Sequence, residues 1–230
     1  MIKPSLAHRA VAEALGTAFL LATVVGSGIM GEKLAGGNVA IALLANTFAT
    51  GAGLVALIFT FSSISGAHMN PAVTLADASQ GGLPWRDVPA YLVAQVAGAF
   101  GGVAVAHTMF EKPTFFLSTH VREGRSQLVS EFVATYGLLA VIWGCGRRRA
   151  EATPFAVGAY ITAAYWFTSS TSFANPAVTL ARAASDTFAG IRPTDVPGFI
   201  FAQLLGAAAA TLTFRWLSPA VTPEAETALE

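Results

Sequence analysis

The sequence predicts an all-α membrane protein, with six transmembrane helices and two re-entrant half-helices arranged as an inverted repeat. The first observation is composition: hydrophobic residues make up 54% of the 230 residues, and charged residues only 11%. A soluble domain usually carries about a quarter charged residues. The second observation is that Asn-Pro-Ala-Val-Thr-Leu-Ala occurs twice, at residues 70–76 and 175–181. We therefore expect residues 1–230 to form a single membrane domain, with internal repeats at about 8–115 and 126–217.

Both copies of the repeated sequence have the features of a helix N-terminus. Asparagine is a favourable N-cap, because its side-chain oxygen accepts an otherwise unpaired backbone N–H. Proline fits the first helical position, where its missing N–H costs nothing. We predict short helices over about residues 71–79 and 176–185. Ten residues make only ~15 Å of helix, half of a hydrocarbon core of ~30 Å, so neither helix is expected to cross the membrane.

The remaining apolar segments account for the transmembrane helices. Each is about 16 to 24 residues long, and glycine, proline or charged residues separate it from the next. A span needs ~20 predominantly apolar residues, so the fifth segment is short for this role. The predicted spans cover about residues 10–30, 38–61, 89–110, 127–146, 153–168 and 196–217, and the tail over 218–230 is expected to fray.

Further matches show that the repeat extends over the whole of each half. Glu13 in the first span corresponds to Glu131 in the fourth, and residues 87–89 correspond to residues 195–197. Each half then contains three full spans, and because three is odd, the second half must be inverted relative to the first. The half-helices enter from opposite faces and meet near the midplane, an arrangement in which broken helices form a binding site.

The distribution of Lys and Arg gives the orientation in the membrane, since cytoplasmic loops carry more of them. With the N-terminus inside, seven basic residues lie on the inner side and six on the outer side. This difference is small, but the arginine run over 147–149, next to a span end, favours the same choice. We predict a multi-pass protein of the cell inner (plasma) membrane with cytoplasmic N- and C-termini.

Several functional classes are not supported. The formal net charge is zero, which argues against nucleic acid as a partner. Cys145 is the only cysteine, and the four histidines show no ligand spacing, so neither a metal nor another cofactor is predicted. No nucleophile is spaced with a base in a catalytic pattern, so the chain is not expected to be an enzyme.

The chain resembles the major intrinsic proteins, which are the aquaporins and aquaglyceroporins. The resemblance covers about residues 8–217, including the Ser-Gly-Ala-His sequence before the first repeat. It implies an aquaporin-like homotetramer, surrounded by membrane lipids, with one pore per subunit for water and small neutral solutes. The matching residues are Glu13 and Glu131 together with two Asn-Pro-Ala boxes: Asn70, Pro71 and Ala72, and Asn175, Pro176 and Ala177.

The segments before the boxes are expected to line the pore. Non-helical backbone at membrane depth is tolerated only where it is buried in protein or lines a water-filled cavity. The free carbonyls of residues 62–69 and 169–174 would offer acceptors along the pore, and Asn70 and Asn175 would point their amide groups into it. The resemblance implies that the two glutamates accept backbone N–H groups from these segments, whereas their burial also allows a proton relay.

Three charged or titratable residues are candidates for the two mouths of the pore. His68 would line or gate the inner vestibule, or else be a loop histidine bonded to backbone. Asp77 would lie at the inner mouth and Arg182 in the outer vestibule, one helical turn beyond Val178. The alternative for both charges is a solvated position at the end of a half-helix.

The selectivity filter departs from the family pattern. Family members usually carry an arginine directly after the second Asn-Pro-Ala, where this chain has Val178. Counting from the two asparagines places the other filter positions at Thr50, Ala163 and Ser172. Water-selective members resemble each other in having a bulky aromatic, a histidine and the arginine there. All four residues of this chain are smaller, which predicts a wide filter without a fixed charge.

The sequence therefore predicts a passive channel for small uncharged solutes, with accompanying water permeability. Glycerol-like polyols are one candidate class, and neutral or methylated metalloid acids such as arsenicals are another. Divergent bacterial members that lack the filter arginine resemble this chain and are associated with arsenic resistance. The alternatives are a proton-coupled secondary transporter using Glu13 and Glu131, a water-selective aquaporin, and a structural membrane protein with a vestigial pore.

Overall fold

The computed structural model describes residues 4–146 and 149–217, and its regular structure is helical. This confirms the predicted all-α membrane fold. Short 3-10 turns precede three of the helices, over Trp85–Asp87, Ala150–Ala152 and Pro193–Asp195. The α-helices are α1 (Leu6–Leu34), α2 (Val39–Ser65), α3 (Pro71–Ser79), α4 (Val88–Met109), α5 (Arg125–Gly146), α6 (Thr153–Phe167), α7 (Pro176–Arg182) and α8 (Val196–Leu217).

Five helices of the described chain are long and apolar enough to cross a membrane, namely α1, α2, α4, α5 and α8. The predicted fifth span, α6, has only 15 residues, about 22 Å of helix. Helices α1 and α2 are longer than expected from the sequence. Ser5 caps the start of α1 through its side chain, and Gly66 ends α2 in the left-handed conformation that glycine tolerates.

The two halves of the chain form equivalent helix pairs. Helix α1 packs along α4, and α5 packs along α8 in the same way. A Cβ atom at Gly98 would collide with the carbonyl oxygen of Ala14, and one at Gly206 would collide with the carbonyl oxygen of Phe132. The absence of a side chain therefore lets the backbones cross closely, as is usual between membrane helices.

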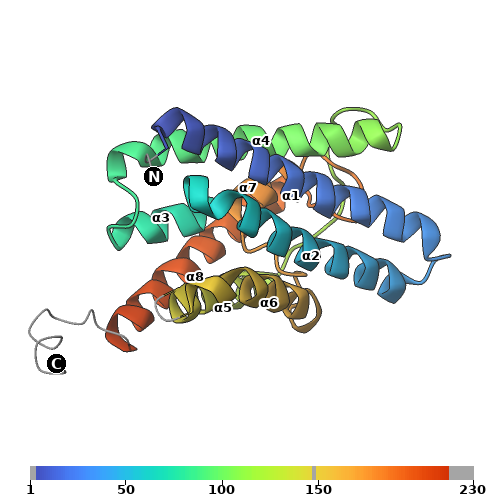
Figure 1. The fold of residues 1–230 in the computed structure, drawn as a ribbon. Coiled ribbons are helices and arrows are strands. Elements are labelled where there is room, and N and C mark those ends of the chain that lie inside the picture. The colour runs from blue at the N-terminus through green and yellow to red at the C-terminus, as the bar shows by residue number, and fades with distance from the viewer. Residues whose placement is uncertain (1–3, 147–148, 218–230) are drawn as a thin grey trace, which may run out of the picture.

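The bundle has two distinct ends (Figure 1). The start of α1 and the end of α8 lie at the same end, beside α3, and we call this the termini end. The opposite end, here the loop end, carries the α1–α2 connection and residues 110–124 between α4 and α5. Helix α7 ends at Arg182, earlier than predicted, because the carbonyls of Ala183 and Ala184 accept hydrogen bonds from Ser118 and Phe116.

Candidate functional site

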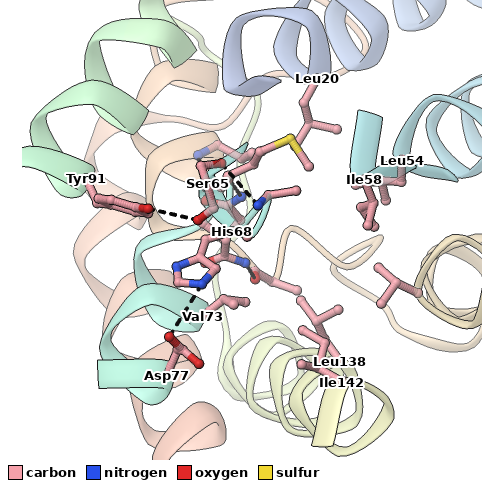
Figure 2. A pocket seen from close by; sticks show the side chains of 18 of the residues that line it. Leu20, Leu54, Ile58, Ser65, His68, Val73, Asp77, Tyr91, Leu138 and Ile142 are labelled. Carbon is pink, nitrogen blue, oxygen red and sulfur yellow. Dashed lines mark hydrogen bonds and ion pairs between the residues drawn. The ribbon is translucent and has the colours of Figure 1, made fainter. Parts of the chain in front are cut away.

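A cavity of about 690 Å³ lies between the helices and reaches from Arg9 at the termini end to Arg182. Figure 2 shows its part near the termini end, where one wall is polar and carries Ser65, His68, Asp77 and Tyr91. The opposite wall is apolar. A solute with hydroxyl groups on one side and carbon on the other matches both walls. The apolar side chains labelled on that wall are Leu20, Leu54, Ile58, Leu138 and Ile142, whereas Val73 lies beside His68 and Asp77.

Two non-helical segments, residues 66–69 and 170–174, contribute much of the polar lining. They contain non-glycine residues with φ between 47° and 61°: Ala67, Met69, Thr171, Ser172 and Ala174. Such left-handed conformations are uncommon for residues with a side chain. Each costs about 1–3 kcal/mol and persists only where the surroundings impose it. The surroundings that do so are two buried carboxyl groups.

The first carboxyl group belongs to Glu13 on α1, which is fully buried. It accepts hydrogen bonds from the backbone N–H groups of His68 (2.9 Å) and Met69 (2.6 Å). The Ser65 hydroxyl (2.6 Å) and the Gln95 amide (2.7 Å) donate to the same group. Glu13 thus ties the first irregular segment to α1 and α4.

Glu131 on α5 holds the second segment with the same set of donors. It is fully buried and accepts from the backbone N–H groups of Phe173 and Ala174, both at 2.9 Å. The Ser170 hydroxyl and the Gln203 amide donate to it as well, both at 2.6 Å. Neither Glu13 nor Glu131 is among the described residues that line the cavity. The geometry therefore indicates that both carboxyl groups hold the backbone of the two non-helical segments in place.

Asn70 and Asn175 lie where the two half-helices meet, and both line the cavity. The Asn70 side-chain oxygen accepts from the N–H of Ala72 (2.9 Å), and the Asn175 oxygen from the N–H of Ala177 (3.0 Å). The expectation that both amide groups point into the cavity is only partly met. Each NH2 donates to a carbonyl of the other half, Asn70 to Ala174 (2.8 Å) and Asn175 to Met69 (2.7 Å). One N–H of each amide remains for the cavity.

The other residues of the two boxes, Pro71, Ala72, Pro176 and Ala177, are buried at the starts of α3 and α7. Towards the termini end, the His68 ring nitrogens lie 3.1 Å from the Thr74 hydroxyl and 3.6 Å from an Asp77 carboxylate oxygen. His68 and Asp77 both line the cavity. The His68 ring is therefore held by side chains, and Figure 2 shows it beside Asp77 in the polar wall.

Towards the loop end, Thr50, Ser172 and Val178 line the cavity, but Ala163 does not. Ala163 is exposed on the outer face of α6, so its predicted filter position is wrong in helical register. Tyr165 faces the cavity in its place, and its hydroxyl donates to the Thr50 hydroxyl at 3.3 Å.

The error arises because counting from Asn175 assumes a fixed length of chain between α6 and the box. A different signal was present in the sequence: Val157, Ile161 and Tyr165 recur every four residues, which is one face of a helix. All three line the cavity. The bulky aromatic ring of Tyr165 also means that the cavity is not lined by small residues alone at this level.

Arg182 is not a solvated charge at the end of α7, as one alternative proposed, because it is only 2% exposed. Its Nε donates to the carbonyl oxygen of Ala189, and its Cζ lies 3.3 Å from the centre of the Phe173 ring. Arg182 lines the cavity. The α7 helix thus places a guanidinium group inside the protein, one turn beyond Val178.

Sequence reasoning did not identify Arg122 as a site residue. It lies in the segment between α4 and α5, is 8% exposed, and has its Cζ 4.9 Å from the Phe173 ring centre. Its Nε donates to the carbonyl of Gly190 (2.8 Å), and Nη1 to that of Ser170 (3.0 Å). Burial lowers the pKa of Arg122 to about 10, so it remains charged at neutral pH. No sequence pattern marks a buried arginine in a long loop.

His120 lies two residues before Arg122 and lines a second, smaller pocket of about 210 Å³. Burial lowers the pKa of His120, and the positive charges of Arg122 and Arg182 lower it further, whereas Asp186 acts in the opposite direction. The remaining residues that line this pocket are Glu32, Asp186, Thr187 and Phe188.

Comparison with known proteins accounts for this arrangement. The model of the Major intrinsic protein family matches residues 1–172. The chain is 57% identical over 212 residues to the aquaglyceroporin AqpS of Rhizobium meliloti (strain 1021), covering 92% of this chain and 91% of that protein. It is 36% identical over 187 residues to aquaporin NIP1-3 of Oryza sativa subsp. japonica, covering 78% and 64%.

A solved structure has the same fold. The X-ray structure of the aquaglyceroporin from Plasmodium falciparum superposes with a TM-score of 0.69 at 18% identity, covering 97% of this chain and 100% of that one. The two boxes, the paired glutamates and the cavity are features of one architecture. The chain therefore belongs to the major intrinsic protein family, and it is a membrane channel for small solutes and water, not an enzyme.

Proposed function

We propose that the channel passively conducts small uncharged solutes larger than water, with water accompanying them. The candidate solutes are glycerol-like polyols and neutral or methylated metalloid acids such as arsenicals. The observation that carries the proposal is Val178, which lines the cavity directly after the second Asn-Pro-Ala box. An apolar valine leaves room at the level where the family usually has an arginine. The similarity to a protein named as an aquaglyceroporin supports the same conclusion.

The shape and chemistry of the cavity also support this proposal. The cavity lining offers hydrogen-bond partners along its length, including Ser65, His68, Asn70, Asn175 and Thr50. Its apolar wall accepts the carbon side of a polyol. A solute can therefore exchange its hydration for protein contacts without complete loss of hydrogen bonding.

The burial of the two glutamates argues against the proton-coupled transporter. Glu13 and Glu131 are separated from the cavity, and each receives hydrogen bonds from four donors. A coupled transporter needs a carboxyl group that gains and loses a proton in contact with the solute path. We therefore expect solute flux to follow the solute gradient alone and to be unchanged by an imposed pH gradient.

Stopped-flow light scattering on proteoliposomes tests the proposal. Water, glycerol and arsenous acid permeabilities are compared for the unmodified channel, Val178→Arg and Val178→Leu. We expect the unmodified channel to pass all three, and Val178→Arg to lose the two larger solutes while it keeps water. Val178→Leu adds bulk without charge, and so separates the effect of side-chain size from the effect of charge. A channel that passes only water, or a Val178→Arg variant without effect, would overturn the proposal.

We further propose that the chain is one channel domain in the inner membrane, forms a homotetramer, and has both termini in the cytoplasm. The termini end of the cavity is then the inner mouth and the loop end the outer mouth. Native mass spectrometry from detergent tests the oligomer, with an expected mass four times that of the 23.7 kDa chain. Protease digestion of N-terminally tagged protein in inside-out and right-side-out vesicles tests the orientation.

A further inference from the structure

The terminal nitrogens of Arg182, one helical turn beyond Val178, donate no hydrogen bond to the described part of the chain. The only hydrogen bond from this side chain to the described part of the chain is the one from Nε to the carbonyl of Ala189. The side chain is 2% exposed and lines the cavity, so its two Nη groups have the cavity as their remaining neighbour. A buried guanidinium without a carboxylate partner needs an acceptor to offset its desolvation.

The Ser172 hydroxyl supplies a second donor, and Ser172 directly precedes Phe173, whose ring packs against the Arg182 guanidinium. Ser172 lines the cavity, and its oxygen is buried without a hydrogen-bond partner among the described residues. Buried polar side chains are nearly always paired. Two unsatisfied donor groups that line one part of one cavity therefore indicate a place for a ligand with acceptor oxygens.

The Phe173 ring and the Ala189 carbonyl hold the Arg182 guanidinium in position, and Arg122 packs on the same ring. The Phe173 ring has the Cζ of both arginines over it, at 3.3 Å for Arg182 and 4.9 Å for Arg122. Arg122 is itself tied to the carbonyls of Ser170 and Gly190, and its backbone N–H donates to Asp195 at 2.8 Å. A guanidinium stacked on a fixed aromatic ring loses little further entropy when it binds an acceptor.

Arg182 also lies on the way to the loop end. The second pocket is lined by Glu32, His120, Asp186, Thr187 and Phe188, and Ala189, the hydrogen-bond partner of Arg182, follows Phe188 directly in the chain. The Arg182 side chain is thus bonded to a residue that directly follows the lining of this second pocket.

We propose that Arg182 and Ser172 form a subsite for the acceptor oxygens of a permeating solute. Among solutes of equal size, this subsite favours carboxylic acids and oxoacids over amides, because a guanidinium donates two parallel hydrogen bonds to an acid group. The anion of such an acid binds most strongly and competes with neutral solutes for the site. This inference rests on the proposed solute channel. It assigns to Arg182 the fixed positive charge that Val178 does not supply.

Competition in proteoliposomes tests the subsite. Ethylene glycol and water fluxes are measured by stopped flow at neutral pH, with glycolate or its neutral isostere glycolamide present equally on both sides. We expect glycolate to slow both fluxes and glycolamide to have little effect. In Arg182→Gln, the half-inhibitory concentration of glycolate should rise by about tenfold or more. This is the loss of affinity typical of a missing charge-assisted hydrogen bond.

Two further variants complete the experiment. Arg125→Gln removes the same charge from an exposed position at the loop end and should keep the response to glycolate. Arg182→Lys keeps the charge without the planar fork and should show an intermediate response. Equal inhibition by glycolate and glycolamide, or unchanged glycolate inhibition in Arg182→Gln, would overturn the subsite. Absence of ethylene glycol flux in the unmodified channel would overturn the proposed function instead, and water flux would still test the subsite.

Discussion

Replacing Glu13 by glutamine tests whether the buried carboxyl groups hold the cavity lining in place. The glutamine amide would have nearly the same shape as the carboxylate, but one oxygen would become an NH2 group. If the NH2 replaces Oε2, the N–H of Met69 loses its acceptor. If it replaces Oε1, the N–H of His68 loses its acceptor instead. Rotation of Gln95 or of the Ser65 hydroxyl can satisfy the other contact, but a backbone N–H cannot reverse.

The expected cost follows from this count. One buried backbone donor without a partner costs about 1–3 kcal/mol, and the contacts that remain lose the strength of a charged acceptor. We expect a loss of about 2–4 kcal/mol in the free energy of unfolding. The left-handed Ala67 and Met69, with φ of 50° and 47°, would relax in part because their restraint is weakened. Solute flux should fall as the backbone of these two residues relaxes.

Unfolding by a denaturing detergent in mixed micelles measures the stability, and proteoliposome water permeability measures the function. Glu32→Gln, at an exposed position on the same helix, is the matched control. Glu131→Gln should reproduce the effect in the second half, since Glu131 holds two backbone N–H groups in the same way. If Glu13→Gln is as stable as Glu32→Gln, the carboxyl group does not hold the segment and the reasoning fails.

Three further predictions concern packing, helical register and pH. Gly98→Ala should lower the free energy of unfolding by about 1–3 kcal/mol, because its Cβ meets the backbone of α1; Gly101→Ala, with open space around it, should have almost no effect in the same denaturation assay. Tyr165→Ala should raise the permeability to larger polyols, whereas Ala163→Leu, on the outer face of α6, should leave it unchanged; the opposite result would restore Ala163 to the cavity. The thermal stability should fall as the pH falls below about 6.5, the ordinary histidine pKa. Burial and two neighbouring guanidinium groups lower the pKa of His120 in the folded chain. The unfolded chain therefore takes up the proton first, and protonation favours unfolding. His120→Gln should flatten this part of the stability profile, and an unchanged profile would contradict the assignment.

Features that depend on local chemistry could be predicted from the sequence alone. An asparagine N-cap followed by proline requires no distant partner, and α3 and α7 begin at Pro71 and Pro176 as predicted. Apolar length likewise placed the five long helices and the shorter α6 to within a few residues at most ends, since a span is set by the thickness of the hydrocarbon core. The correspondence between Glu13 and Glu131 was visible because the repeat itself is in the sequence.

Features that depend on the rotation of a helix about its axis, or on contacts between the two halves, are visible only in the folded chain. Periodicity gives the faces of α6, but only packing against α2 shows that Tyr165 and not Ala163 faces the cavity. The amides of Asn70 and Asn175 bond across the midplane, which needs both half-helices in place. Arg122 and Arg182 are far apart in the sequence and meet at Phe173 only in the folded chain. Their charges are buried because the fold supplies an aromatic ring and carbonyl oxygens to receive them, and no local sequence pattern encodes such a site.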